Sequence, residues 1–247
     1  MHKDFSYISD ITDGVEAFPF VIQGSDEAGR GPLAGPVVAS TVSIFFDSFE
    51  AIKKVRQILT EWKAFGVNDS KKLSSAKRKE ILFHCGISGF HSTLEEVAGE
   101  IGEGEKYTLW STENVTVQFK IVSKSASYID QYNILNASLH AMWESGVDLN
   151  GAGKNGMWFF DGNRVPKNGE RRLKLIPIVK GDSKMILIGL ASILAKEYRD
   201  FLMTKFAEEY PQYGFDKHAG YPTEAHRAAL KIFGPSPIHR KTYRGVT

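Results

Sequence analysis

Residues 24 to 36 read Gly-Ser-Asp-Glu-Ala-Gly-Arg-Gly-Pro-Leu-Ala-Gly-Pro, so two adjacent carboxylates lead directly into a loop of glycine and proline. The short apolar run Phe18 to Ile22 that precedes them is typical of a strand. Asp26 and Glu27 are therefore predicted to lie where a buried strand reaches the surface. Carboxylates in such a place are useful as ligands for divalent cations.

Gly29, Gly31 and Ala34 superficially match the glycine fingerprint of dinucleotide-binding loops. Such a loop must open a helix whose first N–H groups face a pyrophosphate. Residues 36 to 44 are instead rich in β-branched side chains and favour a second strand. We therefore reject the dinucleotide match and predict a strand, a glycine loop and a strand, with carboxylates that hold cations and cations that hold phosphate.

The composition sets outer bounds on the kind of protein. A length of 247 residues with 42% hydrophobic and 24% charged residues suits one large domain, or a domain with an appendage. The single cysteine, Cys85, forms no internal disulfide, and no apolar leader is evident, which predicts a cytoplasmic protein. No stretch is long enough to span a bilayer. The net charge of +2 neither requires nor excludes nucleic acid.

Periodicity predicts the remaining elements. Residues 89 to 113, which are acidic and glycine-containing, are predicted to be irregular or weakly helical. Strands are predicted over residues 115–121, 157–160 and 173–179. Helices are predicted over residues 47–64 with Asp47 as N-cap, 74–84, 127–144 and 183–209, with a final helix that begins at Pro222.

Two further predicted strands run into an aspartate, Asp161 after the first and Asp182 after the second. Together with Asp26 and Glu27, these side chains are expected to converge at one edge of a mixed sheet. Carboxylates held so close would repel one another, and several would stay protonated unless cations bound them. The pattern therefore predicts a pair of Mg²⁺ or Mn²⁺ ions, which favour oxygen ligands.

Each feature also has a purely structural interpretation. Asp26 and Glu27 fit a solvated strand end, Asp161 with Gly162 fits a hairpin turn, and Asp182 fits a helix N-cap. Because successive strand residues point to opposite faces, Asp26 and Glu27 reach one site only if the chain twists or bulges there. The basic residues near the C-terminus fit a solvated, disordered tail.

The chain resembles type 2 ribonuclease H, the bacterial ribonuclease HII family, in several separated segments. The resemblance implies an α/β fold, with a ribonuclease H-like mixed β-sheet flanked by helices and a C-terminal helical appendage. It also implies a catalytic core over residues 1–210 and an appendage with a basic tail over 211–247, packed as one unit. The matching segments are residues 26–36, 69–73, 129–135, 161–163, 180–184 with 191–196, 211–215 and 218–223.

The resemblance implies an endonuclease that cleaves the RNA strand of RNA–DNA hybrids and single ribonucleotides embedded in duplex DNA. Cleavage is expected on the 5′ side of the ribonucleotide at an RNA–DNA junction, leaving a 3′-hydroxyl and a 5′-phosphate. The implied protein is a monomer without a membrane partner, and it uses two divalent metal ions, Mg²⁺ or Mn²⁺. By position, the implied catalytic and metal-binding residues are Asp26, Glu27, Asp161 and Asp182.

Substrate contacts also carry over by position. Gly29, Arg30, Gly31 and Tyr221 are implied to recognise the junction, and Lys71, Lys184, Ser192 and Lys196 are implied to contact backbone phosphates. Two alternatives remain open at this stage. One is a catalytically silent nucleic-acid-binding protein of the same fold, which the presence of all four acids argues against. The other is a DNA-directed metal-dependent nuclease, which the junction-reading residues argue against.

Overall fold

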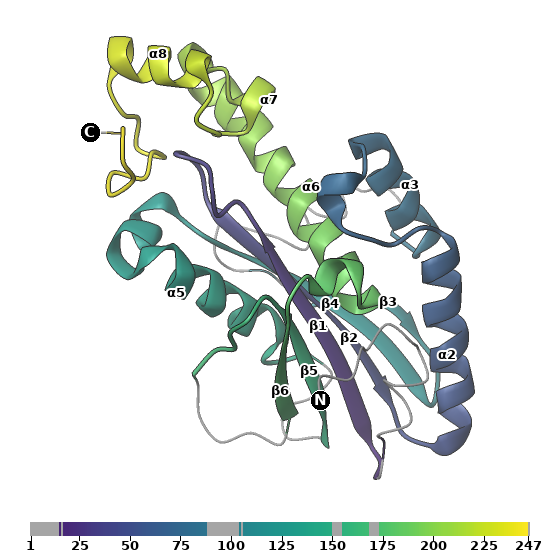
Figure 1. Ribbon diagram of the computed structural model, residues 1–247. Helices are drawn as coiled ribbons and strands as arrows, with labels where there is room; N and C mark the ends of the chain where they lie inside the picture. Colours follow the sequence, from purple (N-terminus) through teal and green to yellow (C-terminus); the bar gives the residue numbers. More distant parts are fainter. Residues whose placement is uncertain are drawn as a thin grey trace.

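A mixed sheet of six strands forms the centre of the molecule in the computed structural model, which describes residues 15, 17–87, 104, 106–149, 155–167 and 173–246 (Figure 1). The strands lie in the order β3-β4-β2-β1-β5-β6. β1 pairs with β2, β2 with β4 and β3 with β4 in antiparallel fashion, whereas β1 with β5 and β5 with β6 are parallel. The predicted mixed α/β sheet is confirmed. Its strands are β1 (Phe20–Ala28), β2 (Val37–Phe46), β3 (Tyr107–Ser111), β4 (Val115–Lys124), β5 (Asn155–Asp161) and β6 (Leu173–Ile178).

Helices cover both faces of this sheet. α2 (Phe49–Ala64), α3 (Ser75–His84) and α6 (Ile186–Glu209) share one apolar core with the first face. α5 (Ala126–Gly146) packs against β2 and β4 on the other face. No helix among the described residues is long and apolar enough to cross a membrane.

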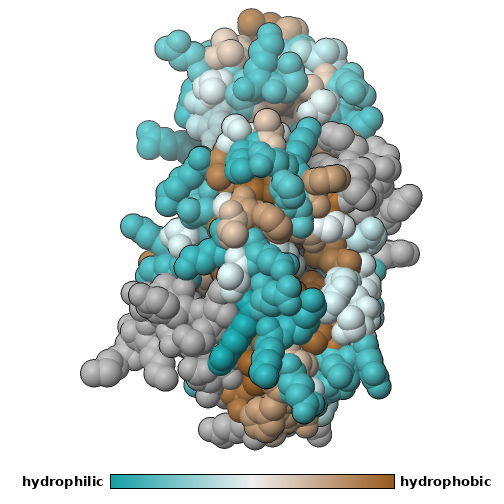
Figure 2. Space-filling model, turned by 90° about the vertical axis from the view of Figure 1, so that its right-hand side faces the viewer, coloured by the Kyte–Doolittle hydropathy of each residue, from teal (hydrophilic) through white to brown (hydrophobic). Residues whose placement is uncertain are grey.

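α2 is amphipathic, which explains why the sequence folds it onto the sheet. Its buried residues Ala51, Val55, Leu59 and Trp62 recur at intervals of one helical turn, so they form a single apolar stripe. The side of the molecule that carries α2 and α3 faces the viewer in Figure 2, and polar side chains cover most of it. The apolar stripe of α2 thus faces the core while its charged residues face water.

The apolar run of β5 is buried from both sides. Phe159 joins the core beneath α6, whereas Trp158 and Phe160 pack against α5. Trp158 stacks on Trp143 with ring centroids 5.4 Å apart. A strand covered on both faces needs no polar alternation, which accounts for the continuous run of apolar residues here.

α6 approaches β1 closely at Gly24. A Cβ atom on Gly24 would lie 2.6 Å from Cβ of Leu187 and 2.7 Å from N of Ile188, so a side chain does not fit there. This contact holds the start of α6 against β1 two residues before Asp26. The close packing therefore fixes where the carboxylate end of β1 lies relative to α6.

Several helix starts differ from the predictions. Ser48, not Asp47, is the N-cap of α2, and its hydroxyl accepts from N–H of Ala51. α6 begins at residue 186 and not at 183, because residues 181–183 form the 3₁₀ turn η2 (Gly181–Ser183) and Met185 is extended. The last helix, α8 (Glu224–Phe233), has Thr223 as its N-cap, so Pro222 precedes the cap and does not lie in the first turn.

The prediction of irregular structure over residues 89–113 is wrong at its C-terminal end. Residues 107–111 form β3, the edge strand of the sheet, and Tyr107 packs on Phe119 of β4 with ring centroids 5.1 Å apart. A bulge between Thr108 and Trp110 breaks the alternation that would have marked this strand in the sequence. Residues 88–103 and 105 lie outside the described residues.

The C-terminal segment folds against the glycine loop. η3 (Pro211–Tyr213), α7 (Phe215–His218) and α8 pack around a small apolar core that includes Leu33 and Ala34. Three backbone hydrogen bonds of 2.8 Å join the two segments: Leu33 N–H to Gly220 O, Gly35 N–H to Ile238 O, and Arg240 N–H to Leu33 O. His239 and Arg240 are 1% and 0% exposed, so the interpretation of the basic tail as solvated and disordered is wrong at these positions.

A chain of histidines lies inside this segment. His239 Nδ1 accepts from the Ser236 N–H at 2.9 Å, so its proton is on Nε2, which lies 2.9 Å from Nε2 of His226. His226 must then carry its own proton on Nδ1, which donates to Tyr221 O at 2.9 Å. Both rings have to be neutral for this chain to form, because two N–H groups cannot face each other.

Burial lowers the pKa of His239 to about 4, and the neighbouring His226 adds to the effect. The unfolded chain takes up this proton near the ordinary pKa of 6.5. The stability contributed by neutral His239 is therefore complete above that pH and is lost as the pH falls toward about 4. From linkage, the loss between about pH 7 and pH 5 is about 2 kcal/mol.

We predict that His239→Asn, which keeps an acceptor for the Ser236 N–H but cannot titrate, flattens this pH dependence. Urea unfolding of both proteins at about pH 7 and pH 5 measures it. Wild type should lose about 2 kcal/mol more than the variant over this interval. Equal losses in the two proteins would show that His239 is not the group responsible.

Candidate active site

Three neighbouring parallel strands bring carboxylates to the same edge of the sheet. Asp26 and Glu27 lie near the C-terminal end of β1, and Asp161 is the last residue of β5, which pairs with β1. Asp182 lies in η2, just after β6, which pairs with the other side of β5. The carboxyl ends of β1, β5 and β6 therefore meet beside the start of α6, as Figure 1 shows.

The carboxyl groups of the two acids of β1 are buried, and neighbouring negative charges repel them. Burial raises the pKa of Asp26 well above its ordinary value, and the charges of Glu27 and Asp161 raise it further. Burial also raises the pKa of Glu27 to about 7, although the Arg30 guanidinium, 3.4 Å away, opposes the shift. Burial and the neighbouring negative charges thus both disfavour the ionised forms of these two carboxyls.

Asp161 and Asp182 belong to the same electrostatic cluster. Asp161 Oδ1 accepts from the Gly181 N–H at 2.7 Å, which ties the end of β5 to η2. Burial raises the pKa of Asp182, and the charges of Asp161 and Asp69 add to the rise. The hairpin-turn interpretation of Asp161 is wrong, because β5 and β6 are parallel. The helix-cap interpretation of Asp182 is also wrong, because Lys180 is the N-cap of η2 and Met185 is the N-cap of α6.

Asp26 and Glu27 reach this edge without a bulge. The pairing of β1 with β2 runs unbroken from Phe20 to Ala28. The Glu27 N–H donates to Asp26 Oδ1 at 2.7 Å, so the Asp26 side chain turns toward its neighbour. Of the two ways that the sequence allowed for both acids to face one site, a bulge is therefore not the one used.

The donor chemistry of the cluster fits divalent cations. Its ligand atoms are carboxylate oxygens, which Mg²⁺ and Mn²⁺ prefer, and bound cations would offset the repulsion that raises these pKa values. Across the described residues, no three His, Cys, Asp or Glu side chains are already arranged to hold a metal ion.

Lys71 is a basic residue that interacts electrostatically with the carboxylate cluster. Although burial opposes the shift, the charges of Asp26, Asp182, Asp69 and Asp161 raise the pKa of the Lys71 ammonium. Lys71 lies in the 3₁₀ turn η1 (Ser70–Lys72). Lys71, which is predicted to contact phosphate, is thus within electrostatic range of all four predicted catalytic acids.

Sequence reasoning missed the residues that hold this turn. Asp69 is its N-cap and accepts from the Lys71 N–H at 3.0 Å. Arg78 of α3 donates to Ser70 O at 3.1 Å and to Leu73 O at 2.7 Å, and it forms an ion pair with buried Glu197 of α6. The segment 69–73 stood out in the sequence, but its support from α6 is more than a hundred residues away and leaves no local signal.

The glycine loop and Tyr221 face each other across a small cavity next to Glu27. A Cβ on Gly31 would lie 3.6 Å from Cε1 of Tyr221, and Tyr221 is 42% exposed. Gly29 has a φ of +99°, and a Cβ there would lie within 2.2 Å of Nε of Arg199, so this position requires glycine. The cavity is lined by Glu27, Ala28, Gly29, Arg30, Gly31, Ser70, Lys71, Lys196, Arg199 and Tyr221.

The other three residues predicted to contact phosphate, Lys196, Ser192 and Lys184, lie in three different surroundings. Lys196 lines the same cavity but forms an ion pair of 2.5 Å with Asp200. Ser192 of α6 is buried, and its hydroxyl lies 2.8 Å from that of Ser70, so it supports the turn η1 by a hydrogen bond. Lys184 is exposed and lines a separate cavity beside Asp182, together with Lys63.

The sequence matches a known family over most of its length. The family model described as Ribonuclease HII matches residues 23–245. A ribonuclease HII of Pelodictyon phaeoclathratiforme is 38% identical over 91% of this chain and 89% of its own length. That of Dechloromonas aromatica is 38% identical over 90% of each chain, and that of Chlamydia muridarum is 39% identical over 91% of this chain and 82% of its own.

Solved structures show the same fold. Ribonuclease H2 from Pyrococcus horikoshii aligns with a TM-score of 0.57 at 21% identity, covering 92% of this chain and 95% of its own. A Bst ribonuclease HIII in complex with Mn²⁺ aligns with a TM-score of 0.56 at 14% identity, covering 94% and 69%. These likenesses support the ribonuclease H-like sheet. The family model and the curated relatives show that the chain belongs to the ribonuclease HII family of metal-dependent endonucleases.

Proposed function

We propose that this enzyme cleaves the RNA strand of RNA–DNA hybrids, and single ribonucleotides in duplex DNA, on the 5′ side of the ribonucleotide at an RNA–DNA junction. The products would be a 3′-hydroxyl and a 5′-phosphate. The observation that carries the proposal is a shared residue: Asp26, Glu27, Asp161 and Asp182 form one electrostatic cluster, and Glu27 of this cluster also lines the cavity formed by the glycine loop and Tyr221.

The four carboxylates would hold two divalent ions. Such a pair activates a water for in-line attack on the phosphodiester and stabilises the leaving 3′-oxygen. Asp26, buried beside Glu27 and Asp161, would gain most from a bound cation, because burial and these two negative charges raise its pKa well above the ordinary value. Lys71 and Arg30 would add positive charge on the side where phosphate arrives.

The glycine loop and Tyr221 would provide selectivity for ribose. Glycines allow the backbone to approach the minor groove, where a 2′-hydroxyl both donates and accepts hydrogen bonds. The Tyr221 ring would lie against the next sugar. This contact tolerates a deoxyribose but leaves no room for an added 2′-hydroxyl. The two features line the same cavity, which supports their acting on adjacent nucleotides.

We predict that Asp161→Asn abolishes most metal-dependent cleavage of a duplex that carries one ribonucleotide. Asparagine keeps an acceptor for the Gly181 N–H but lacks the charge that a cation needs. Loss of several kcal/mol of transition-state stabilisation corresponds to a fall in kcat of about 100-fold or more. The measurement is single-turnover cleavage in Mg²⁺.

Asp148→Asn is the matched control, because it removes the same charge from a partly exposed ion pair with Lys120 outside the cluster. Its cleavage rate should equal that of wild type. Intact Mg²⁺-dependent cleavage by Asp161→Asn would show that Asp161 is not a metal ligand.

We predict that Tyr221→Ala lowers the preference for a ribonucleotide junction, because the ring that contacts the next sugar is lost. Aromatic contacts to nucleotides contribute about 1–3 kcal/mol, so the ratio of kcat/KM on a junction duplex to that on a continuous hybrid should fall about tenfold. Tyr221→Phe keeps the ring and should keep the ratio. An unchanged ratio in Tyr221→Ala would exclude Tyr221 from junction recognition.

A further inference from the structure

Two arginines, Arg199 and Arg240, are buried beneath the glycine loop. They are 1% and 0% exposed, and neither takes part in an ion pair within the described part of the chain. Burial lowers the pKa of Arg199 to about 10, which still leaves it charged at neutral pH. Buried charges are costly unless they are well hydrogen-bonded, so their partners indicate what they are retained for.

Those partners are backbone carbonyls of the loop. Arg240 donates from Nη2 to Gly29 O at 2.6 Å and to Pro36 O at 3.2 Å, from Nε to Gly35 O at 3.0 Å, and from Nη1 to Arg30 O at 3.1 Å. Its fifth donor reaches the Tyr243 hydroxyl at 3.2 Å. That hydroxyl in turn donates to Arg30 O at 2.9 Å. Every N–H of the Arg240 guanidinium is therefore used, four of them on the loop itself.

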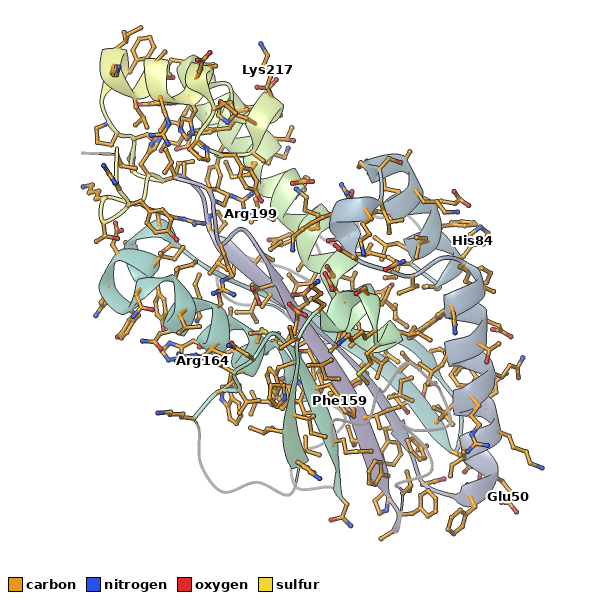
Figure 3. All side chains as sticks on the ribbon, viewed as in Figure 1. Glu50, His84, Phe159, Arg164, Arg199 and Lys217 are labelled. Carbon is orange, nitrogen blue, oxygen red and sulfur yellow. The ribbon has the colours of Figure 1, made fainter. Side chains whose placement is uncertain are left out.

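Arg199 holds the same loop from α6, and Figure 3 shows it at the loop that joins β1 to β2. It donates to Pro36 O at 3.0 Å, to Ala34 O at 3.1 Å and to Ala219 O at 3.1 Å. Arg199 thus joins the loop to the core, whereas Arg240 joins it to the C-terminal segment.

The contacts of Arg240 set the orientation of two peptide groups. In a trans peptide the C=O of one residue and the N–H of the next point in opposite directions. Gly29 O and Arg30 O both point inward to Arg240 and Tyr243. The N–H groups of Arg30 and Gly31 must therefore point the other way, toward the cavity where Gly31 meets Tyr221. No described residue accepts from either N–H.

We infer that Arg240, supported by Tyr243, is a positioning residue for ribose recognition: it aims the Arg30 and Gly31 N–H groups at the 2′-hydroxyl of the substrate. The inference rests on the proposed function. It assigns a role in selectivity to the C-terminal segment through a residue that never touches the substrate. Without the inward hydrogen bonds, the two peptides are free to rotate, and the loop would bind ribose and deoxyribose alike.

The test is the ratio of two affinities, that for a duplex with one ribonucleotide over that for an all-DNA duplex of the same sequence. Both are measured by fluorescence anisotropy in chelator, so that nothing is cleaved. Arg240→Met should lower the ratio about tenfold, as expected for a lost hydrogen bond to the ribose, while affinity for all-DNA duplex stays near that of wild type. A merely structural role would weaken both affinities together.

Three further variants make the result decisive. Tyr243→Phe leaves the ring in place but removes the hydroxyl from Arg30 O, and it should lower the ratio several-fold even if Arg240→Met does not fold. Arg240→Lys retains part of the hydrogen bonding and should fall between wild type and Arg240→Met. Lys231→Met removes an exposed charge from α8 and should leave the ratio unchanged.

An unchanged ratio in folded Arg240→Met, or in Tyr243→Phe, would overturn the inference while wild-type selectivity remained. If wild type itself neither prefers the ribonucleotide duplex nor cuts it in Mg²⁺, the proposed function fails first. The two failures are therefore distinguishable.

Discussion

The parallel pairing of β5 with both β1 and β6 is the constraint on which the site depends. It requires the carboxyl ends of three strands to meet at one edge, and the sequence places an acid at or just after each end. α6 packs closely on Gly24 and so covers that edge of the sheet from one side. The resulting burial and repulsion raise the pKa values of Asp26, Glu27 and Asp182. Bound cations would offset this repulsion and stabilise the ionised carboxylates.

A second constraint acts on the neighbouring loop. The glycine loop has few side chains with which to fix itself, and its conformation is set from outside by guanidinium groups of α6 and of the C-terminal segment. The histidine chain that ends on Tyr221 O belongs to the same segment. Both features that we assign to ribose recognition are therefore held by residues that follow the catalytic sheet in the sequence.

Much of this arrangement is predictable from the sequence, because it depends on local patterns. Strand ends followed by acids indicated the shared edge, and the glycine loop followed by β-branched residues excluded a dinucleotide fold. Some local details and the long-range contacts were not predictable. A bulge hid β3, Ser48 displaced Asp47 as a cap, and buried Arg240 looked like part of a solvated tail. Its carbonyl partners are about two hundred residues earlier, a separation that no periodicity reports.

The most direct test of the account is the cleavage of an end-labelled DNA duplex that carries one ribonucleotide, beside an all-DNA duplex of the same sequence, in Mg²⁺, in Mn²⁺ and in chelator. We expect a single metal-dependent cut on the 5′ side of the ribonucleotide, with a 3′-hydroxyl and a 5′-phosphate as ends, and no cut in the control. Folded protein that leaves the ribonucleotide duplex intact with either metal, or cuts both duplexes equally, would contradict it.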